Sequence, residues 1–208
     1  MNENAVCGWA LENAAQRLGA RRIAGLDEAG RGPLFGPVVA AAVILPKGFR
    51  LDGLTDSKQL TEKQRTAFDA RIRDGAKAWA IAAVDAETID RIDIRQASLL
   101  AMRRAVEQLA AAPDFLLIDG RDTIVWPCAQ QAVIRGDARS LSIAAASVLA
   151  KVHRDRLLIE LDAVYPGYGL ARHKGYGTQQ HLEALRRLGP SPLHRKSFAP
   201  VAQLQLFA

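Results

Sequence analysis

Two adjacent carboxylates, Asp27 and Glu28, stand directly before a Gly-Arg-Gly turn at residues 30–32. The apolar residues just before them predict the end of a buried strand. Carboxylates at a strand end are typical ligands of divalent metal ions, and a glycine turn beside an arginine lets backbone N–H groups approach phosphate or sugar. A solvated turn without a ligand is the alternative interpretation of the same residues.

A phosphate-binding P-loop is a further interpretation, because Gly25 and Gly30 have the spacing of its two glycines. That motif continues with a lysine and then a serine or threonine, which contact the phosphates and magnesium. Arg31 and Gly32 occupy those positions here. The sequence therefore excludes a nucleotide-binding loop of that type.

Two more carboxylates extend the acidic pattern. Asp119 follows the apolar run at residues 115–118, which predicts a second buried strand ending at a carboxylate. If the strands that carry Asp27 and Asp119 are neighbours, these side chains meet at one edge of the sheet. Asp137 precedes a long predicted helix, where it either completes the cluster or caps the helix. Oxygen ligands without histidine or cysteine suit magnesium or manganese, and two such ions about 4 Å apart support phosphodiester cleavage.

The chain of 208 residues is basic, with 28 Lys and Arg against 22 Asp and Glu, a net charge of +6 and a pI of about 9.7. Such a charge favours a polyanionic partner. Basic residues concentrate at 135–156 and 172–196, where we expect a phosphate backbone to lie. An acidic metal site together with a basic surface indicates a nuclease.

Other classes of site are not indicated. Cys7 and Cys128 lack metal-binding or redox spacing and are expected to be free thiols, and the histidines show no zinc pattern. The first twenty residues contain no apolar run of signal-peptide length, and the longest uncharged stretch, 32–46, is too short to span a membrane. We therefore expect a cytoplasmic protein that does not contact a membrane.

The elements that must position these residues follow from apolar periodicity and turn residues. Strands are predicted at residues 22–26, 38–45, 78–84 and 115–118, and helices at residues 61–73, 94–111, 142–161 and 179–188. Lys151 and Arg154 are expected on the solvent side of the third helix. Residues 165–176 predict a loop or small lobe. Strands followed by alternating helices and strands predict an α/β fold with a mixed sheet flanked by helices.

Several sequence blocks resemble, in the same order, the signature of bacterial ribonuclease HII, and the resemblance covers about residues 20 to 200. These blocks are DEAGRGP at 27–33, DSKQL at 56–60, IDG at 118–120, GDARS-L-SIAAAS at 136–147, HKGYGT at 173–178, GPSP at 189–192 and SF at 197–198. Gln59 departs from the lysine that is common in that family.

The resemblance implies a ribonuclease H-like fold with a small C-terminal helical lobe. The expected catalytic domain is 21–201, divided into a core at 21–165 and a substrate-binding lobe at 166–201, with an N-terminal extension at 1–20 and a tail at 202–208. The resemblance also implies cleavage of the phosphodiester 5′ to a ribonucleotide, in RNA–DNA hybrid or in DNA duplex with embedded ribonucleotides. The implied products are 3′-hydroxyl and 5′-phosphate ends, and the implied roles are ribonucleotide removal and RNA primer degradation.

The resemblance further implies a role for each matched residue. Two divalent ions, Mg²⁺ or Mn²⁺, are expected on the carboxylates of Asp27, Glu28, Asp119 and Asp137. The ribose 2′-hydroxyl, which distinguishes RNA from DNA, is expected on the backbone of Gly30, Arg31 and Gly32. Tyr176 is expected to stack on the sugar of the following deoxynucleotide. Lys58 and the late arginines are expected to hold phosphates.

The C-terminal tail has a pattern of its own. Residues 203–207 resemble the Gln-Leu-x-Leu-Phe peptide by which bacterial replication and repair proteins dock on the sliding clamp, with Gln205 departing from the usual middle residue. The expected contacts are Gln203, Leu204, Leu206 and Phe207. The alternative is that these side chains pack back onto the domain.

Two other functions are open alternatives. A non-catalytic nucleic-acid-binding module explains the charge and the glycine turn, but without metal its acidic cluster would repel phosphate. A junction resolvase on the same fold explains the carboxylates but not the pairing of the 30–32 turn with Tyr176. We expect the chain to be a monomer.

Overall fold

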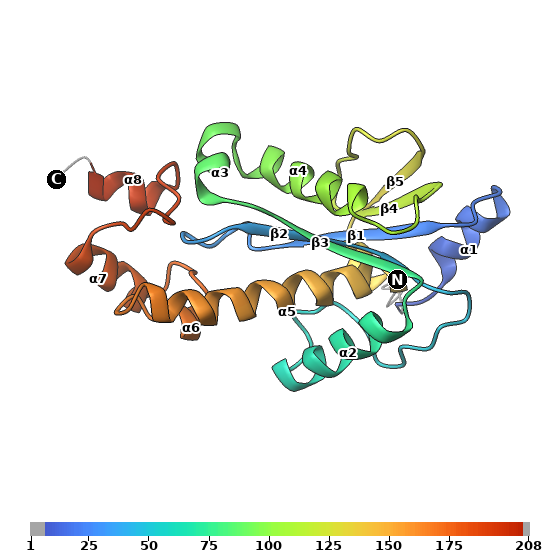
Figure 1. Cartoon of the computed structure of the whole chain (residues 1–208), viewed down its shortest axis with the longest axis horizontal. Coiled ribbons are helices and arrows are strands. Elements are labelled where there is room, and N and C mark those ends of the chain that lie inside the picture. The colour runs from blue at the N-terminus through green and yellow to red at the C-terminus, as the bar shows by residue number, and fades with distance from the viewer. Residues whose placement is uncertain (1–6, 206–208) are drawn as a thin grey trace, which may run out of the picture.

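The computed structural model describes residues 7–205, and its centre is one mixed five-stranded sheet (Figure 1). The strand order is β3-β2-β1-β4-β5. Strands β1, β2 and β3 pair antiparallel, whereas β4 is parallel to β1 and β5 is parallel to β4. The bounds are β1 (Ile23–Ala29), β2 (Val38–Ile44), β3 (Ala78–Val84), β4 (Phe115–Asp119) and β5 (Ala129–Val133).

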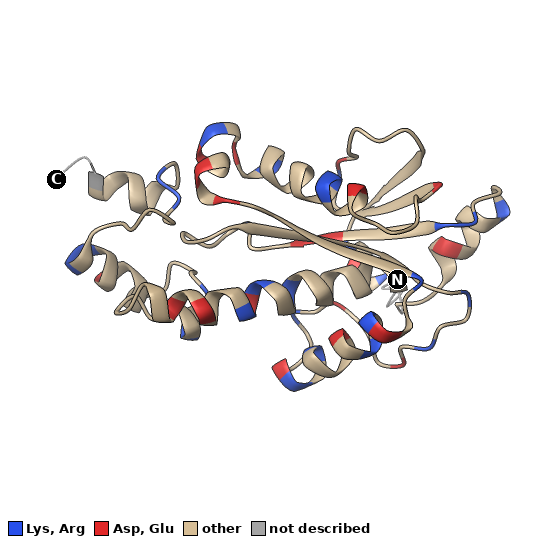
Figure 2. Ribbon diagram, viewed as in Figure 1, with Lys and Arg blue, Asp and Glu red and all other residues tan. Residues whose placement is uncertain are grey.

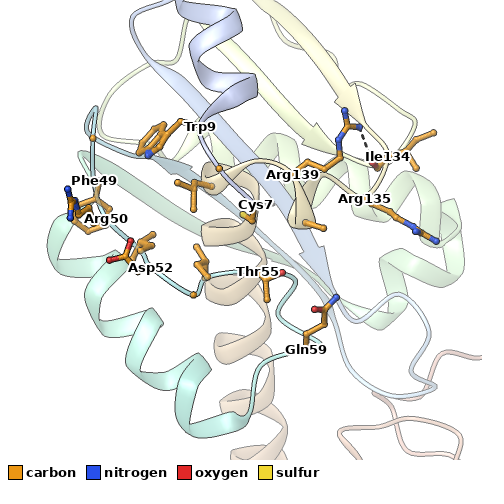
Figure 3. A pocket seen from close by; sticks show the side chains of 17 residues that line it. Cys7, Trp9, Phe49, Arg50, Asp52, Thr55, Gln59, Ile134, Arg135 and Arg139 are labelled. Carbon is orange, nitrogen blue, oxygen red and sulfur yellow. Dashed lines mark hydrogen bonds between the residues drawn. The ribbon is translucent and has the colours of Figure 1, made fainter. Parts of the chain in front are cut away.

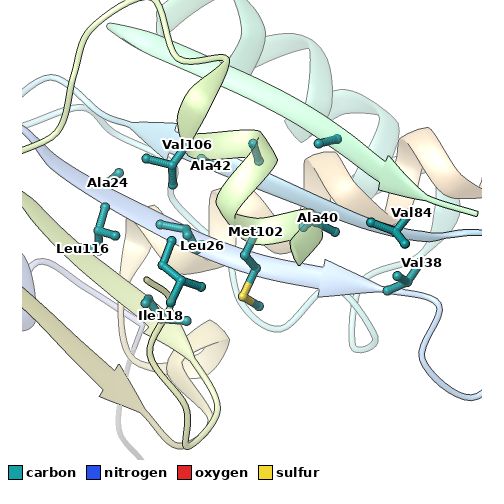
Figure 4. Packing of buried hydrophobic residues seen from close by; sticks show 14 of the residues in the cluster. Ala24, Leu26, Val38, Ala40, Ala42, Val84, Met102, Val106, Leu116 and Ile118 are labelled. Carbon is teal, nitrogen blue, oxygen red and sulfur yellow. The ribbon is translucent and has the colours of Figure 1, made fainter. Parts of the chain in front are cut away.

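Helices cover both faces of the sheet, so β2 is buried along its whole length and has a continuous apolar sequence. One face packs against α4 (Ile94–Glu107), with α3 (Ala86–Ile92) before it. Figure 4 shows Met102 and Val106 of α4 among side chains from β1, β2, β3 and β4. The other face packs against α5 (Leu141–Val164), which α2 (Glu62–Gly75) covers in turn.

Helix α5 lies very close to β1, and Gly25 allows this approach. A Cβ atom at Gly25 would lie 2.1 Å from the carbonyl carbon of Ser142 in the first turn of α5. Ser140 caps the helix by accepting a hydrogen bond from the Ile143 N–H. The start of α5 is therefore fixed against the strand that carries Asp27.

A small helical lobe follows α5 and encloses its own apolar cluster, which includes Phe35, Leu158, Leu170 and Leu185. Its helices are α6 (Leu170–His173), α7 (Gln179–Leu188) and α8 (Ala199–Gln205). The remaining helices are α1 (Ala10–Arg17) and the 3-10 turn η1 (Gly136–Ala138) between β5 and α5. The predicted α/β class, the mixed sheet and the C-terminal helical lobe are confirmed.

The sequence patterns missed α1, α3, β5, α6 and α8. All are short, and β5 alternates exposed and half-buried residues with little apolar character. In residues 7–205, no helix is both long enough and apolar enough to cross a membrane. Cys7 and Cys128 are free thiols, as expected.

Candidate active site

Charge is nearly absent from the sheet. Within the five strands of the described chain, the charged residues are Asp27 and Glu28 in β1 and Asp119 in β4. Figure 2 shows this contrast between the uncharged strands and the helices, on which both signs of charge are distributed. Three carboxylates in an otherwise uncharged sheet indicate a site rather than a solvated surface.

Asp27 and Asp119 lie side by side because their strands are neighbours. The parallel register of β1 and β4 pairs Leu26 with Ile118, so both carboxylates come one residue later. Leu26 and Ile118 pack on the α4 face, and side chains alternate along a strand. Asp27 and Asp119 therefore project toward α5, at the end of their strands.

The turn that carries Asp137 is joined directly to Asp119. The Gly136 N–H donates to Asp119 Oδ1 at 2.7 Å. A Cβ atom at Gly136 would lie 2.5 Å from Ile143 Cδ1 and 3.3 Å from Asp119 Oδ1, so any larger residue here would have to displace these side chains. The sequence blocks contained Gly136 but did not reveal this role, because the contact partner comes from another strand.

Glu12 of α1 supports the same turn from the other side. Its carboxylate is 2% exposed, and its Oε1 accepts from Ser140 Oγ at 2.6 Å and from the Ser142 N–H at 2.9 Å. The Ser140 N–H in turn donates to the Gly136 carbonyl at 2.8 Å. A helix outside the predicted catalytic core thus holds the start of α5 behind Asp137.

Burial and neighbouring carboxylates raise the pKa values of Asp27 and Asp137. Burial, followed by the charges of Glu28 and Asp119, holds the pKa of Asp27 well above its usual range, although a hydrogen bond from Ser147 opposes this. Burial and the charges of Asp56 and Asp119 raise the pKa of Asp137 to about 6. Asp27 and Asp137 each have Asp119 among their neighbouring charges, so these carboxylates lie near one another.

Two cations border this region. Arg31 Nη1 lies 3.3 Å from Glu28 Oε1, and this pairing partly offsets the burial that raises the pKa of Glu28. Burial lowers the pKa of Lys58, but the charges of Asp56 and Asp137 outweigh it and leave that pKa above its usual value. Lys58 is exposed in the 56–58 turn, next to the carboxylates.

A divalent ion fits the chemistry of this donor set, although the side chains are not closed around one position. In residues 7–205 no three Asp, Glu, His or Cys side chains are disposed to hold one metal ion. Asp119 instead accepts from Gly136 N–H, and Glu28 pairs with Arg31. Buried oxygen ligands that repel one another are nevertheless what a hard cation stabilises, because its charge removes the repulsion.

The turn at residues 30–32 lies beside Tyr176. Gly30 has a φ of +97°, which favours glycine, and Arg31 and Gly32 are exposed. A Cβ atom at Gly32 would lie 3.7 Å from the Tyr176 ring, which is 45% exposed. The two elements expected to read sugars are therefore in contact distance.

Buried histidines support the Tyr176 segment. His181 Nδ1 donates to the Tyr176 carbonyl at 3.0 Å, and the Nε2 atoms of His181 and His194 are 3.1 Å apart. His194 Nδ1 accepts from the Ser191 N–H at 2.9 Å. The sequence contained no signal for this role, because the histidines are thirteen residues apart.

Two arginines contradict the sequence-based expectation. Arg154 was expected to face solvent, and the late arginines were expected to hold phosphates, but Arg154 and Arg195 are 1% and 0% exposed. Both donate to backbone carbonyls of residues 30–37. The expectation was wrong for these two residues, because the 30–37 segment and, for Arg154, Lys174 cover their guanidinium groups. For the other late arginines it stays a prediction.

The sequence model of the family described as Ribonuclease HII matches residues 24–201, which is most of the chain. The chain belongs to the ribonuclease HII family. The ribonuclease HII of Geobacter sulfurreducens is 54% identical over 195 residues, covering 94% of this chain and 90% of the relative. That of Myxococcus xanthus is 58% identical over 195 residues, covering 93% of this chain and 66% of the relative.

Solved structures confirm the ribonuclease H-like fold. The ribonuclease H2 of Pyrococcus horikoshii has a TM-score of 0.76 at 24% identity, covering 90% of this chain and 98% of that one. A ribonuclease HIII called Bst-RNase HIII, crystallised with Mn²⁺, has a TM-score of 0.73 at 21% identity, covering 94% of this chain and 72% of that one. Family membership makes this chain a metal-dependent endoribonuclease. Its candidate active site is the carboxylate edge, which we define as the sheet edge and adjoining turn that carry Asp27, Glu28, Asp119 and Asp137.

A cavity lies behind the Asp137 turn and not at the carboxylates. It has a volume of about 1140 Å³ and lies between the 48–55 loop, residues 7–9 and the 134–139 segment (Figure 3). Ala138 and Gln59 line it, but none of the four carboxylates does.

Proposed function

We propose that this chain hydrolyses the phosphodiester 5′ to a ribonucleotide, in RNA–DNA hybrid and in DNA duplex with embedded ribonucleotides, leaving 3′-hydroxyl and 5′-phosphate ends. The observation that carries this proposal is the continuity of β1 with the 30–32 turn. β1 ends at Ala29, directly after Asp27 and Glu28. The acidic edge and the exposed turn are thus at most a few residues apart, so a sugar held at the turn places its phosphate at the carboxylates.

Two divalent ions, Mg²⁺ or Mn²⁺, are proposed at the carboxylates of Asp27, Glu28, Asp119 and Asp137. Ions bound there would activate a water molecule and stabilise the leaving oxygen. The chain's own part is to hold the four carboxylates at one edge and to place Lys58 beside them, where its charge attracts the phosphate.

Sugar recognition is proposed at the backbone of Gly30, Arg31 and Gly32, with Tyr176 stacking on the following deoxyribose. The exposure of Arg31, Gly32 and the Tyr176 ring supports this assignment. Because Gly32 and the Tyr176 ring are adjacent, the ribose and the following deoxyribose could both be bound by this one surface. The helical lobe that supplies Tyr176 would then be the substrate-binding part, at residues 166–201.

A cleavage assay tests the function. One substrate is a DNA duplex with a single ribonucleotide, and the control is the same duplex without it, each with Mg²⁺, Mn²⁺ or EDTA. We expect a metal-dependent nick 5′ to the ribonucleotide and no nick in the control. Equal cleavage of both duplexes would indicate a resolvase, and binding without cleavage in either metal would indicate a binding module.

Docking on a sliding clamp is proposed for the tail. The ribonuclease HII of Archaeoglobus fulgidus, with a TM-score of 0.72 at 24% identity, was solved in a PCNA:RNase HII complex. Here Gln203 and Leu204 belong to α8, and Leu204 packs against the lobe, whereas Leu206 and Phe207 lie outside the described residues. Leu204 thus favours the alternative of packing for the first half of the peptide.

Calorimetry with a purified bacterial clamp tests the tail. We expect heat of binding from the full chain and none from a Leu206→Ala, Phe207→Ala double variant with unchanged cleavage of a short duplex. No heat from the full chain would refute the proposal. We further propose that the enzyme is cytoplasmic and monomeric, and sedimentation of the purified chain tests the latter.

A further inference from the structure

The backbone of residues 30–37 lies over two buried guanidinium groups, those of Arg154 and Arg195. Neither forms an ion pair with a carboxylate in the described part of the chain. Burial and the neighbouring Arg154 charge lower the pKa of Arg195 to about 9. Burying two like charges costs free energy of folding, which indicates that the backbone segment held by their hydrogen bonds has a function.

All six of their hydrogen bonds go to backbone carbonyls. Arg195 donates to the carbonyls of Gly30 at 2.6 Å, Arg31 at 2.9 Å and Gly36 at 3.0 Å. Arg154 donates to those of Phe35 at 3.0 Å, Pro37 at 3.1 Å and Lys174 at 3.0 Å. A charged donor makes a stronger bond than a neutral one, so these carbonyls are firmly directed inward.

The direction of a carbonyl decides the direction of the next N–H, because the two point oppositely across a trans peptide. Arg195 draws the carbonyls of Gly30 and Arg31 inward, and this turns the N–H groups of Arg31 and Gly32 outward. No acceptor within residues 7–205 takes either N–H. Arg31 and Gly32 are exposed while Gly30 is buried, as this orientation requires.

Arg154 joins this turn to the segment that carries Tyr176. One guanidinium binds Phe35 and Pro37 on one side and Lys174 on the other. The fit is close, since a Cβ atom at Gly30 would lie 2.1 Å from Arg154 Nε. Together with the hydrogen bond from the Leu34 N–H to the Gly175 carbonyl at 2.8 Å, this side chain therefore sets the spacing between the exposed N–H groups and the Tyr176 ring.

We propose that Arg154 and Arg195 are positioning residues for sugar recognition: they turn the N–H groups of Arg31 and Gly32 toward the substrate and fix them at a set distance from Tyr176. This inference rests on the proposed function and assigns its selectivity to residues that do not touch the substrate. Their loss should impair cleavage at a single ribonucleotide while sparing affinity for DNA, which depends on phosphate contacts elsewhere.

Lysine substitution separates charge from geometry. A lysine keeps the positive charge but lacks the planar five-donor fork that holds three carbonyls at once. The test variants are Arg195→Lys and Arg154→Lys. Arg71→Lys is the matched control, because Arg71 also donates to a loop carbonyl, that of Arg50 at 2.9 Å, on another part of the surface.

The experiment measures kcat and KM on a duplex with one ribonucleotide, and Kd for the same duplex without it, at one salt concentration. Thermal denaturation first sets a temperature at which each variant is folded. We expect kcat/KM to fall about 10- to 100-fold in the test variants, as for a misplacement near 1 Å, with DNA affinity and the control unchanged. Unchanged kcat/KM in a folded variant, or an equal loss of DNA affinity, would overturn the inference.

Amide NMR of the wild-type protein gives a second readout that needs no variant. We expect the Arg31 and Gly32 resonances to shift more with the ribonucleotide duplex than with the all-DNA duplex. Equal shifts, or none, would overturn the inference. A wild-type protein that leaves the ribonucleotide duplex uncut would instead overturn the proposed function, so the two failures are distinguishable.

Discussion

The carboxylate edge and the 30–37 segment are held by opposite backbone groups. At the edge, acidic side chains accept from N–H groups, as Asp119 does from Gly136. Under the segment, arginine side chains donate to carbonyls, as Arg195 does to Gly30. The arginines use their donors on the protein, whereas Asp27 and Asp137 have raised pKa values. Under the proposed function, the 30–37 segment would be formed before substrate arrives, and a cation would complete the acidic edge.

The largest effect is expected at the acidic edge. Replacing Asp27 or Asp119 by Asn, or Glu28 by Gln, should reduce cleavage about 1000-fold or more, because a neutral amide cannot hold the cation. Asp137→Asn should behave similarly. Cleavage, duplex binding and thermal denaturation should be measured together. Normal turnover by Asp27→Asn, or full wild-type activity in EDTA, would show that the acidic edge does not need a cation and so does not differ from the 30–37 segment in this respect.

A smaller effect, on the free energy of unfolding, is expected when the backbone of the 30–37 segment is strained. Gly30→Ala combines a φ of +97° with a Cβ atom placed 2.1 Å from Arg154 Nε. Gly53→Ala is matched in backbone, with a φ of +83°, but meets nothing within 4 Å. We expect Gly53→Ala to cost about 1 kcal/mol and Gly30→Ala about 3 kcal/mol or more. Denaturant unfolding measures both, and equal costs would mean that Arg154 moves aside freely.

Tyr176 should affect selectivity more than stability. Tyr176→Ala should lower kcat/KM at a lone ribonucleotide about tenfold while leaving Kd for all-DNA duplex nearly unchanged, because stacking acts on the sugar and phosphate contacts supply affinity. Tyr176→Phe keeps the ring and should retain most activity. If binding and cleavage fall equally at one salt concentration, Tyr176 only supports the fold.

The smallest effect concerns pH. Burial and the neighbouring His181 lower the pKa of His194 from its usual 6.5 to about 4, so the folded lobe holds this ring neutral. A depressed folded pKa stabilises the fold above pH 6.5, and that stability is lost as the pH falls from 6.5 toward 4. Thermal denaturation should show a decline over this window that is weaker in His194→Asn, and an identical decline in both proteins would be contrary to this account.

The sequence alone predicted what depends on neighbouring residues. The apolar run of β2, the helix expected at residues 61–73 and the carboxylates at the ends of β1 and β4 are all local patterns. The metal-ligand roles and the sugar-reading turn were inferred from motif resemblance and stay predictions. The contact between the 30–32 turn and Tyr176 needed the tertiary structure, since more than 140 residues separate them.

The positions of Arg154 and Arg195 could not be predicted from local sequence patterns. A helical pattern classifies Arg154 only as polar, and polar positions are expected at the surface. Its acceptors at Phe35 and Pro37 are 119 and 117 residues away, and those of Arg195 on the 30–32 turn are 164 and 165 residues away. A buried charged side chain needs hydrogen-bond or ion-pair partners, and for these two arginines the partners are distant backbone carbonyls. The sequence by itself determined which groups can do chemistry, and the tertiary structure decided which of them lie at an exposed edge and which are buried and hold backbone segments in place.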